Sequence, residues 1–227
     1  MTSAAALNLA AEVAHAHEST TLAAADHLNV SFSSGGLAFR VKRQPHALAR
    51  VEARLSPLRQ QITLTGDTPR PRTIAVRDSD DLRSRLAGLR SPSRRLRRQP
   101  EDIGGFAGAA IWTYLTLPLL LDRAEQLHRP PDAGGVRRLR ITLPAILTGH
   151  GRVQTLHVGV DSLICRHGHR DRFRDLGTRG PGDHVLPDLR RRPIGTTRVV
   201  HPRLGRPLPA ATLVWIHIHS VQVAQPA

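Results

Sequence analysis

The stretch ATLVWIHIHSVQV, residues 211–223, is rich in β-branched residues and predicts a strand near the C-terminus. Side chains two positions apart on a strand share one face, so His217 and His219 are expected to point the same way as Trp215 and Val221. Two imidazoles on one face hold zinc when a third ligand approaches, and otherwise form the polar side of a half-buried strand. Both interpretations of this pair stay open.

Two other stretches of the C-terminal half have the same character. RRLRITLPAIL (137–147) and VQTLHVGVDSLIC (153–165) predict strands, and Pro144 places the first of them at a sheet edge. The segment 166–210 is rich in Arg, Pro and Gly and has no sustained periodicity, so we expect it to be loop or disorder.

The N-terminal part is chemically distinct, because residues 1–39 contain no Lys or Arg. Ala-rich runs at 3–17 and 20–28 favour helix. In VSFSSGGLAFRVK (30–42), apolar residues alternate on both sides of a Ser-Gly-Gly turn, which predicts a β-hairpin.

The stretches from 46 to 90 contain both helix-like and strand-like patterns. Leu48, Val51, Leu55 and Leu58 have three- and four-residue spacings, which predict a helix over 46–59. QITLTG (61–66) predicts a strand. TIAVRDSDDLRSRLAGLR (73–90) predicts a strand followed by a helix.

The run 103–121 contains no charged residue and follows the basic, proline-bounded linker SPSRRLRRQP (91–100). Its 19 residues approach the length of a membrane span, but glycines, Thr113, Thr116 and Pro118 dilute it. We therefore favour a buried helix in a soluble domain over a helix that crosses a membrane.

Together these features predict a loosely packed α+β chain with N-terminal helices and a hairpin, a central apolar helix, a few C-terminal strands and long disordered Arg/Pro-rich segments. The expected parts are a helical segment with a hairpin and a strand-helix unit (1–90), a basic linker (91–102), an apolar helix (103–129) and a strand-containing basic region (130–227) with disorder over 166–210.

The composition limits the function classes. The chain has 227 residues, a formal net charge of +15 and only 3% aromatic residues, so it lacks the large side chains that usually specify a core. Cys165 is the single cysteine, which excludes an intramolecular disulfide and a cysteine-based zinc framework. The N-terminus has no basic residue before its apolar part and is interrupted by Glu12, so it does not match a secretory signal, and the cytoplasm is favoured. Neither a kinase loop nor a Gly-x-Ser-x-Gly elbow is present, and the balance is against an enzyme.

One short motif points to metal chemistry. DSLICRHGHRD (161–171) resembles the metallo-β-lactamase superfamily signature, in which an apolar strand leads into a His-x-His-x-Asp-His loop. The resemblance implies that His167, His169 and Asp171 are zinc ligands of a hydrolase, with His217 and His219 as further candidates. Arg172 stands where the family has its closing histidine, and the resemblance covers about ten residues. Apart from this zinc, no cofactor is expected.

The charge points to nucleic acid as a partner. Clusters at Arg94, Arg95, Arg97 and Arg98, at Arg137, Arg138 and Arg140, and at Arg190, Arg191 and Arg192 can neutralise phosphates with release of counterions. No helix-turn-helix, RNA-recognition or zinc-finger pattern accompanies them, so the binding would be independent of sequence.

A third interpretation concerns the origin of the chain. Lys42 is the only lysine, arginine and histidine are in excess, and glutamate is scarce, as in a GC-rich gene that is translated on the wrong strand or in the wrong frame. The first expectation is therefore that the chain has no selected biochemical activity. Non-specific nucleic-acid binding and a zinc-dependent hydrolase are the alternatives.

Overall fold

A single antiparallel sheet dominates the part of the chain that the computed structural model describes, namely residues 2–41, 45–66, 72–75, 100–144, 152–171, 174–179, 197–201, 203–204, 206–207 and 212–225. Within these residues the sheet has eleven strands in the order β4-β3-β2-β1-β13-β10-β9-β8-β7-β6-β5. Its strands are β1 (His27–Gly35), β2 (Val51–Ser56), β3 (Gln61–Gly66), β4 (Arg72–Ala75), β5 (Gln126–His128), β6 (Arg137–Thr142), β7 (Val153–Val158), β8 (Ile164–Asp171), β9 (Arg174–Arg179), β10 (Thr197–His201) and β13 (Val214–Ala224). A separate two-stranded ribbon pairs β11 (Arg203–Leu204) with β12 (Arg206–Pro207).

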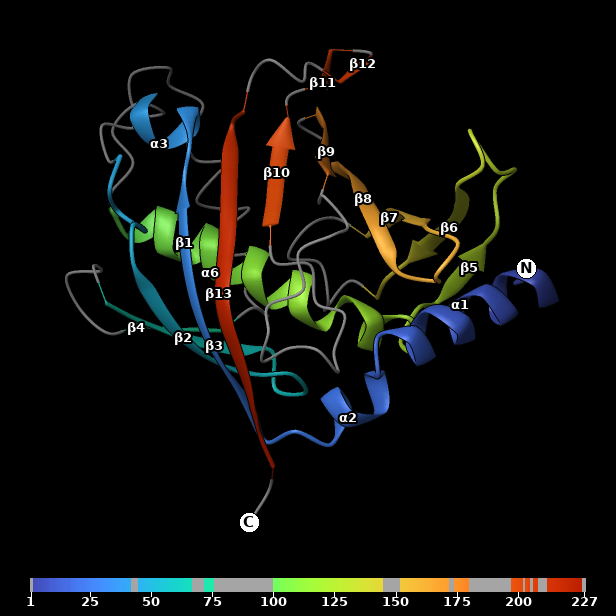
Figure 1. Cartoon of the computed structure of the whole chain (residues 1–227), viewed down its shortest axis with the longest axis horizontal. Coiled ribbons are helices and arrows are strands. Elements are labelled where there is room, and N and C mark those ends of the chain that lie inside the picture. The colour runs from blue at the N-terminus through green and yellow to red at the C-terminus, as the bar shows by residue number, and fades with distance from the viewer. Residues whose placement is uncertain are drawn as a thin grey trace.

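The described helices are α1 (Ala4–Ala16), α2 (Ser19–Ala23), α3 (Leu37–Val41), α6 (Pro100–Thr116) and the 3-10 turn η1 (Leu117–Leu120). Helices α1 and α6 lie against one face of the sheet, which we call the inner face. Helix α6 crosses behind β1 and β13 (Figure 1), while α1 contacts β5 and β6. The opposite face, the outer face, carries the other set of alternating side chains.

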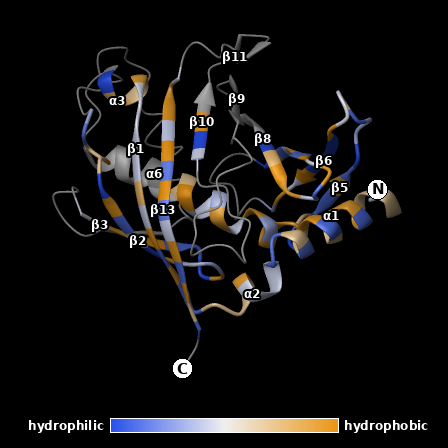
Figure 2. Cartoon of the chain, in the orientation of Figure 1, coloured by the Kyte–Doolittle hydropathy of each residue, from blue (hydrophilic) through white to orange (hydrophobic). Residues whose placement is uncertain are grey.

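Strand periodicity explains which side chains form the core. Along β2 the residues Val51, Ala53 and Leu55 are buried while Glu52 and Arg54 are exposed, and Figure 2 shows the same alternation of hydrophobic and hydrophilic residues along β13. The register aligns these buried positions across strands, for example Leu55 with Leu28 and Leu139 with Leu156. The inner face is therefore a nearly continuous apolar surface against which α1 and α6 pack.

The predicted fold class, a loosely packed α+β chain, is wrong. Strand is the main secondary structure of the described residues. The central apolar helix expected over 103–121 is not found, because α6 ends at Thr116 and the 3-10 turn η1 follows, with Pro118 inside it. Proline lacks an N–H donor and its ring opposes a continuing α-helix, which accounts for the change of geometry there. No described helix is both long and apolar enough to cross a membrane.

The expected hairpin over 30–42 is also wrong. Val30 and Phe32 lie on β1, but Leu37–Val41 forms the short helix α3, and β1 pairs with β2 and β13 instead. Gly36 has a φ of +126° and lies so close to the Leu213 carbonyl that a Cβ would be 2.5 Å from its oxygen. The absence of a side chain at Gly36 thus lets the backbone after β1 approach the segment that leads into β13.

The helix expected over 46–59 is replaced by strand β2. Val51 and Leu55 are four residues apart, an interval that keeps two side chains on one face both in a helix and in a strand. The segment forms a strand because β1 and β3, its neighbours on either side, both supply backbone hydrogen bonds to it. The predicted strand over 61–66 is confirmed as β3, and the Ala-rich segment 3–17 contains helix α1.

Disorder throughout 166–210 is a further expectation that the fold corrects. Strands β8, β9 and β10 run through this segment and pair with one another. Pro144 follows β6, which lies between β5 and β7 and is not at an edge. The helix expected after 76, the linker arginines and residues 180–196 lie outside the described residues.

The sheet register can be tested by a pair of substitutions on β1. Leu28 is fully buried on the inner face, so Leu28→Ala should lower the free energy of unfolding by about 2–5 kcal/mol. Asn29→Ala changes the adjacent, exposed side chain and should alter it by less than about 0.5 kcal/mol. Urea denaturation measures both. Equal losses, or a larger loss at Asn29, would contradict the assigned faces.

Candidate nucleic-acid interface

The outer face of β6–β9 aligns basic residues from neighbouring strands. Arg138 on β6 pairs with His157 on β7, His157 with Arg166 on β8, and Arg166 with Arg179 on β9. We call these four positions the basic row. Adjacent strands are about 4.8 Å apart, so the row extends about 14 Å across the sheet. Sequence separation hides this alignment, because only register brings the four residues into one line.

The same row continues to an aromatic side chain. Arg179 pairs with Val199 on β10, and Val199 pairs with Trp215 on β13. The indole of Trp215 is half-buried and lies over Gly35, where a Cβ would come within 2.7 Å of its ring. The imidazole of His217 packs beside it, with ring centroids 4.8 Å apart and planes inclined by 48°. An aromatic surface therefore stands at one end of the basic row.

A second row, one step along the strands, contains two residues without side chains. Its register positions are His128, Arg140, Thr155, Gly168, Gly177 and His201. A Cβ built on Gly168 would meet only the Thr155 carbonyl oxygen, at 3.9 Å, which is ordinary contact. The backbone at Gly168 is thus approachable from the outer face, directly beside Arg166.

A local contact holds one cation of the row, Arg138, whereas Arg140 of the second row is exposed. The guanidinium of Arg138 donates from Nε to the Pro131 carbonyl oxygen at 2.7 Å. Neither of the two rows includes an acidic residue at any of its positions. The positive potential of this surface is therefore not cancelled within the rows themselves.

The cluster of Arg137, Arg138 and Arg140 that the sequence singles out is divided between the two faces. Arg137 turns inward, where it donates to Glu12 of α1 at 2.5 Å and to the Gly159 carbonyl oxygen at 2.8 Å. It therefore ties α1 to the β7–β8 turn. Alternation along β6 leaves Arg138 and Arg140 on the outer face, while Arg94, Arg95, Arg97, Arg98, Arg190, Arg191 and Arg192 lie outside the described residues.

The predicted zinc ligands lie on opposite faces of the sheet. His167 is fully buried on the inner face, and its Nε2 donates to Oε1 of Gln154 at 2.8 Å. His217 and His219 are exposed on the outer face, where His219 Nε2 lies 3.0 Å from the Ser33 hydroxyl. A single metal ion cannot be shared by His167 and this outer pair.

The motif residues themselves lie along an extended strand. His169 pairs with Gln154 and Asp171 with Arg174, both within β8. Among the residues that the structure describes, no group of three or more His, Cys, Asp or Glu side chains forms a metal-binding arrangement. The zinc hypothesis for His167, His169 and Asp171 stays a prediction, tested by metal analysis of protein purified without added zinc.

The expectation that Val221 shares a face with His217 and His219 is wrong. The register between β1 and β13 shifts between Ser31 and Phe32, which leaves both His219 and Ser220 exposed and turns Val221 inward. An extra residue of this kind is a β-bulge, and it reverses the faces of all later positions.

Comparisons with known proteins add no assignment to this geometry. No family model matches the chain, and no curated protein is significantly similar to it in sequence. The fold and the outer face define it as an antiparallel β protein with a basic surface.

The glycines at the interface provide a matched test of its geometry. Gly35→Ala would press a Cβ into the indole of Trp215 and should cost about 1–3 kcal/mol of unfolding free energy. Gly168→Ala would bring its Cβ only into ordinary contact with the Thr155 carbonyl oxygen, at 3.9 Å, and should change stability by less than about 1 kcal/mol. Denaturation monitored by tryptophan fluorescence distinguishes the two. If Gly35→Ala left the free energy of unfolding unchanged, the indole of Trp215 could not lie over Gly35.

Proposed function

We propose that the outer face binds single-stranded nucleic acid without sequence preference. The observation that carries the proposal is the alignment of the basic row with Trp215 across six neighbouring strands. Proteins of this kind combine a positive surface that follows the backbone with aromatic side chains on which bases stack. The net charge of +15 supports association with a polyanion of any sequence.

Each part of the surface has a separate task in this proposal. The guanidinium groups of Arg138 and Arg166 bind phosphates and release counterions. Gly168 admits the backbone of the ligand close to the strand, since no side chain stands in its way. Trp215 offers its indole to a base, and His217 beside it extends the aromatic surface.

Single strands fit this surface better than duplex DNA. In the described part of the chain, the two longest helices, α1 and α6, pack against the inner face, so neither can enter a major groove from the outer face. Stacking on Trp215 requires an unpaired base. We therefore expect single-stranded DNA or RNA to bind more tightly than a duplex of the same length.

Neutralising two cations of the basic row tests the phosphate contacts. In the variant that combines Arg138→Gln with Arg166→Gln, the slope of log K against log salt for an oligothymidine should decrease by about 1.4, at about 0.7 for each lost phosphate contact. Fluorescence anisotropy at a series of salt concentrations measures the slope.

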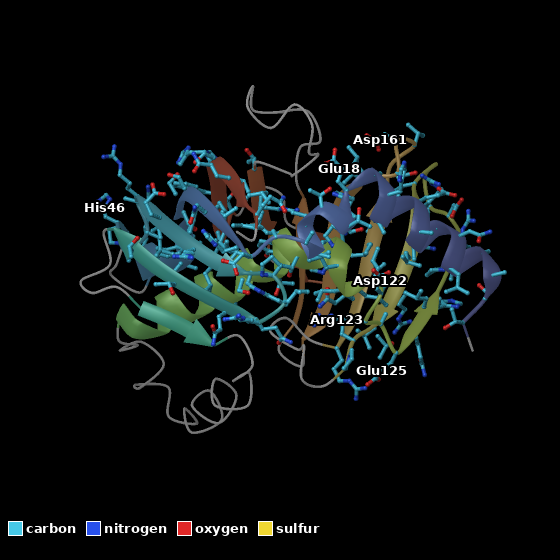
Figure 3. The ribbon with its side chains drawn as sticks, turned by 90° about the horizontal axis from the view of Figure 1, so that it is seen from below. Glu18, His46, Asp122, Arg123, Glu125 and Asp161 are labelled. Atoms are coloured by element: carbon cyan, nitrogen blue, oxygen red, sulfur yellow. The ribbon has the colours of Figure 1, made fainter. Side chains whose placement is uncertain are left out.

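The control is a variant with two arginines replaced away from the row. Arg123 lies beyond η1 near Asp122 and Glu125 (Figure 3), and Arg59 is exposed in the β2–β3 turn. Arg123→Gln combined with Arg59→Gln makes the same change in net charge and should leave the slope nearly unchanged. Equal effects of the two variants would mean that only net charge matters, as expected for a chain without a selected activity.

Replacing the aromatic side chain tests base stacking. Trp215→Leu should weaken binding of single-stranded DNA by about 1–3 kcal/mol and leave duplex binding unchanged, because only unpaired bases stack on the indole. Competition between the two ligands measures the difference. If Trp215→Leu weakened the binding of single strands and of duplex equally, bases would not stack on Trp215.

A further inference from the structure

Four polar side chains interrupt the apolar inner face where α6 ends. They are Tyr114 of α6, Gln154 of β7, His167 of β8 and Arg198 of β10, with exposed fractions of 6%, 1%, 0% and 7%. We call them the inner polar cluster. Register places them on one side of the sheet, since His167 and Val200 both pair with Thr178, and Arg198 is two residues from Val200.

The four side chains form one connected group. The guanidinium carbon of Arg198 lies 5.1 Å from the centre of the Tyr114 ring. The rings of Tyr114 and His167 meet edge to face, with centroids 6.2 Å apart and planes at 86°. His167 in turn donates to Gln154 at 2.8 Å. The cluster therefore holds the charge of Arg198 against the Tyr114 ring, with the imidazole of His167 and the amide of Gln154 next in the group.

Among the described residues, no carboxylate serves as the partner that a buried guanidinium normally has for Arg198. Within the same part of the chain, its Nε is buried without a hydrogen-bond acceptor. Burial lowers the pKa of Arg198 below its ordinary value, although an arginine remains charged in proteins. The ring of Tyr114 offsets only part of the lost hydration, because a cation over a ring gains less than an ion pair does.

The other members offer donors and not negative charge. Burial raises the pKa of Tyr114 to about 12, so its hydroxyl remains protonated at neutral pH. His167 and Gln154 are tied to each other. A negatively charged group that entered here would find one cation, and it would bring the acceptor that Arg198 Nε lacks.

From this arrangement we propose that the inner polar cluster binds the carboxylate of a small apolar acid, with Arg198 as its counter-ion. One cation matches one negative charge, which favours a carboxylate over doubly charged phosphate. The neighbours in the register are apolar, with Ile216 beside Arg198 and Leu156 beside His167, and they suit a hydrocarbon body. This site is independent of the outer face and of the function proposed for it.

The burial of the cluster has a kinetic consequence. Since Tyr114 and Arg198 are both more than nine-tenths buried, a ligand enters only when the packing around these two side chains opens. Binding is then limited by a minor open state, so association is slow and its rate levels off at high ligand concentration.

Thermal unfolding with octanoate as the probe tests the proposal. Octanoate should raise the Tm of the full chain in a concentration-dependent way, whereas 1-octanol and inorganic phosphate should produce a much smaller shift. Arg198→Met keeps a side chain of similar length without the charge. It should weaken octanoate binding at least about tenfold, the loss expected for a hydrogen bond to a charged group.

The unliganded variant provides a second readout that does not depend on octanoate. Replacing an unpaired buried cation by an apolar side chain should leave the Tm of Arg198→Met equal to or above that of the unsubstituted chain. Arg123→Met is the control and should alter neither value. A lower Tm for Arg198→Met without ligand would mean that a group of the chain itself pairs with Arg198, and it would overturn the proposal. An octanoate shift that survives in Arg198→Met, or one that 1-octanol reproduces, would overturn it as well.

Discussion

The pairing of β1 with β13 is the constraint on which the rest of the sheet depends. It joins residues from the two ends of the chain, from His27 opposite Ala224 to Gly35 opposite Trp215. Strands β2, β3 and β4 extend the sheet from β1, and β10 to β5 extend it from β13. Without this pair the sheet would fall into two separate parts, and α6 would lose the continuous surface on which it lies.

Polar contacts at both ends of the pair hold its register. The Asp26 amide donates to the Ala224 carbonyl oxygen at 3.0 Å, and the Ser34 hydroxyl donates to the Trp215 carbonyl oxygen at 2.7 Å. Because side chains alternate with a period of two, a slip by one residue would move the apolar set of β13 to the outer face. The bulge near Ser31 makes one such shift locally, and it is the reason that Val221 joins the core.

Register also separates two kinds of positively charged residue. On the outer face Arg138 and Arg166 can remain hydrated, so a row of cations there costs the fold little. On the inner face Arg198 is shielded from water, and its guanidinium lies over the ring of Tyr114 instead. The other buried residues of the core are apolar from strand to strand, whereas the excess of arginine and the shortage of glutamate have no explanation in the fold.

Local patterns in the sequence were sufficient where one periodicity stood alone. The Ala-rich run predicts α1, QITLTG predicts β3, the β-branched residues of 211–223 predict β13, and the arginine count predicts a basic surface. Tertiary structure decided the partner of each strand, the state of 46–59 and the faces of Arg137 and Arg138. The physical reason is that strands take their hydrogen bonds from residues far away in the chain, and that a four-residue spacing fits helix and strand alike. The basic row and the inner polar cluster each unite residues from several strands, so only the register of the folded sheet brings them together.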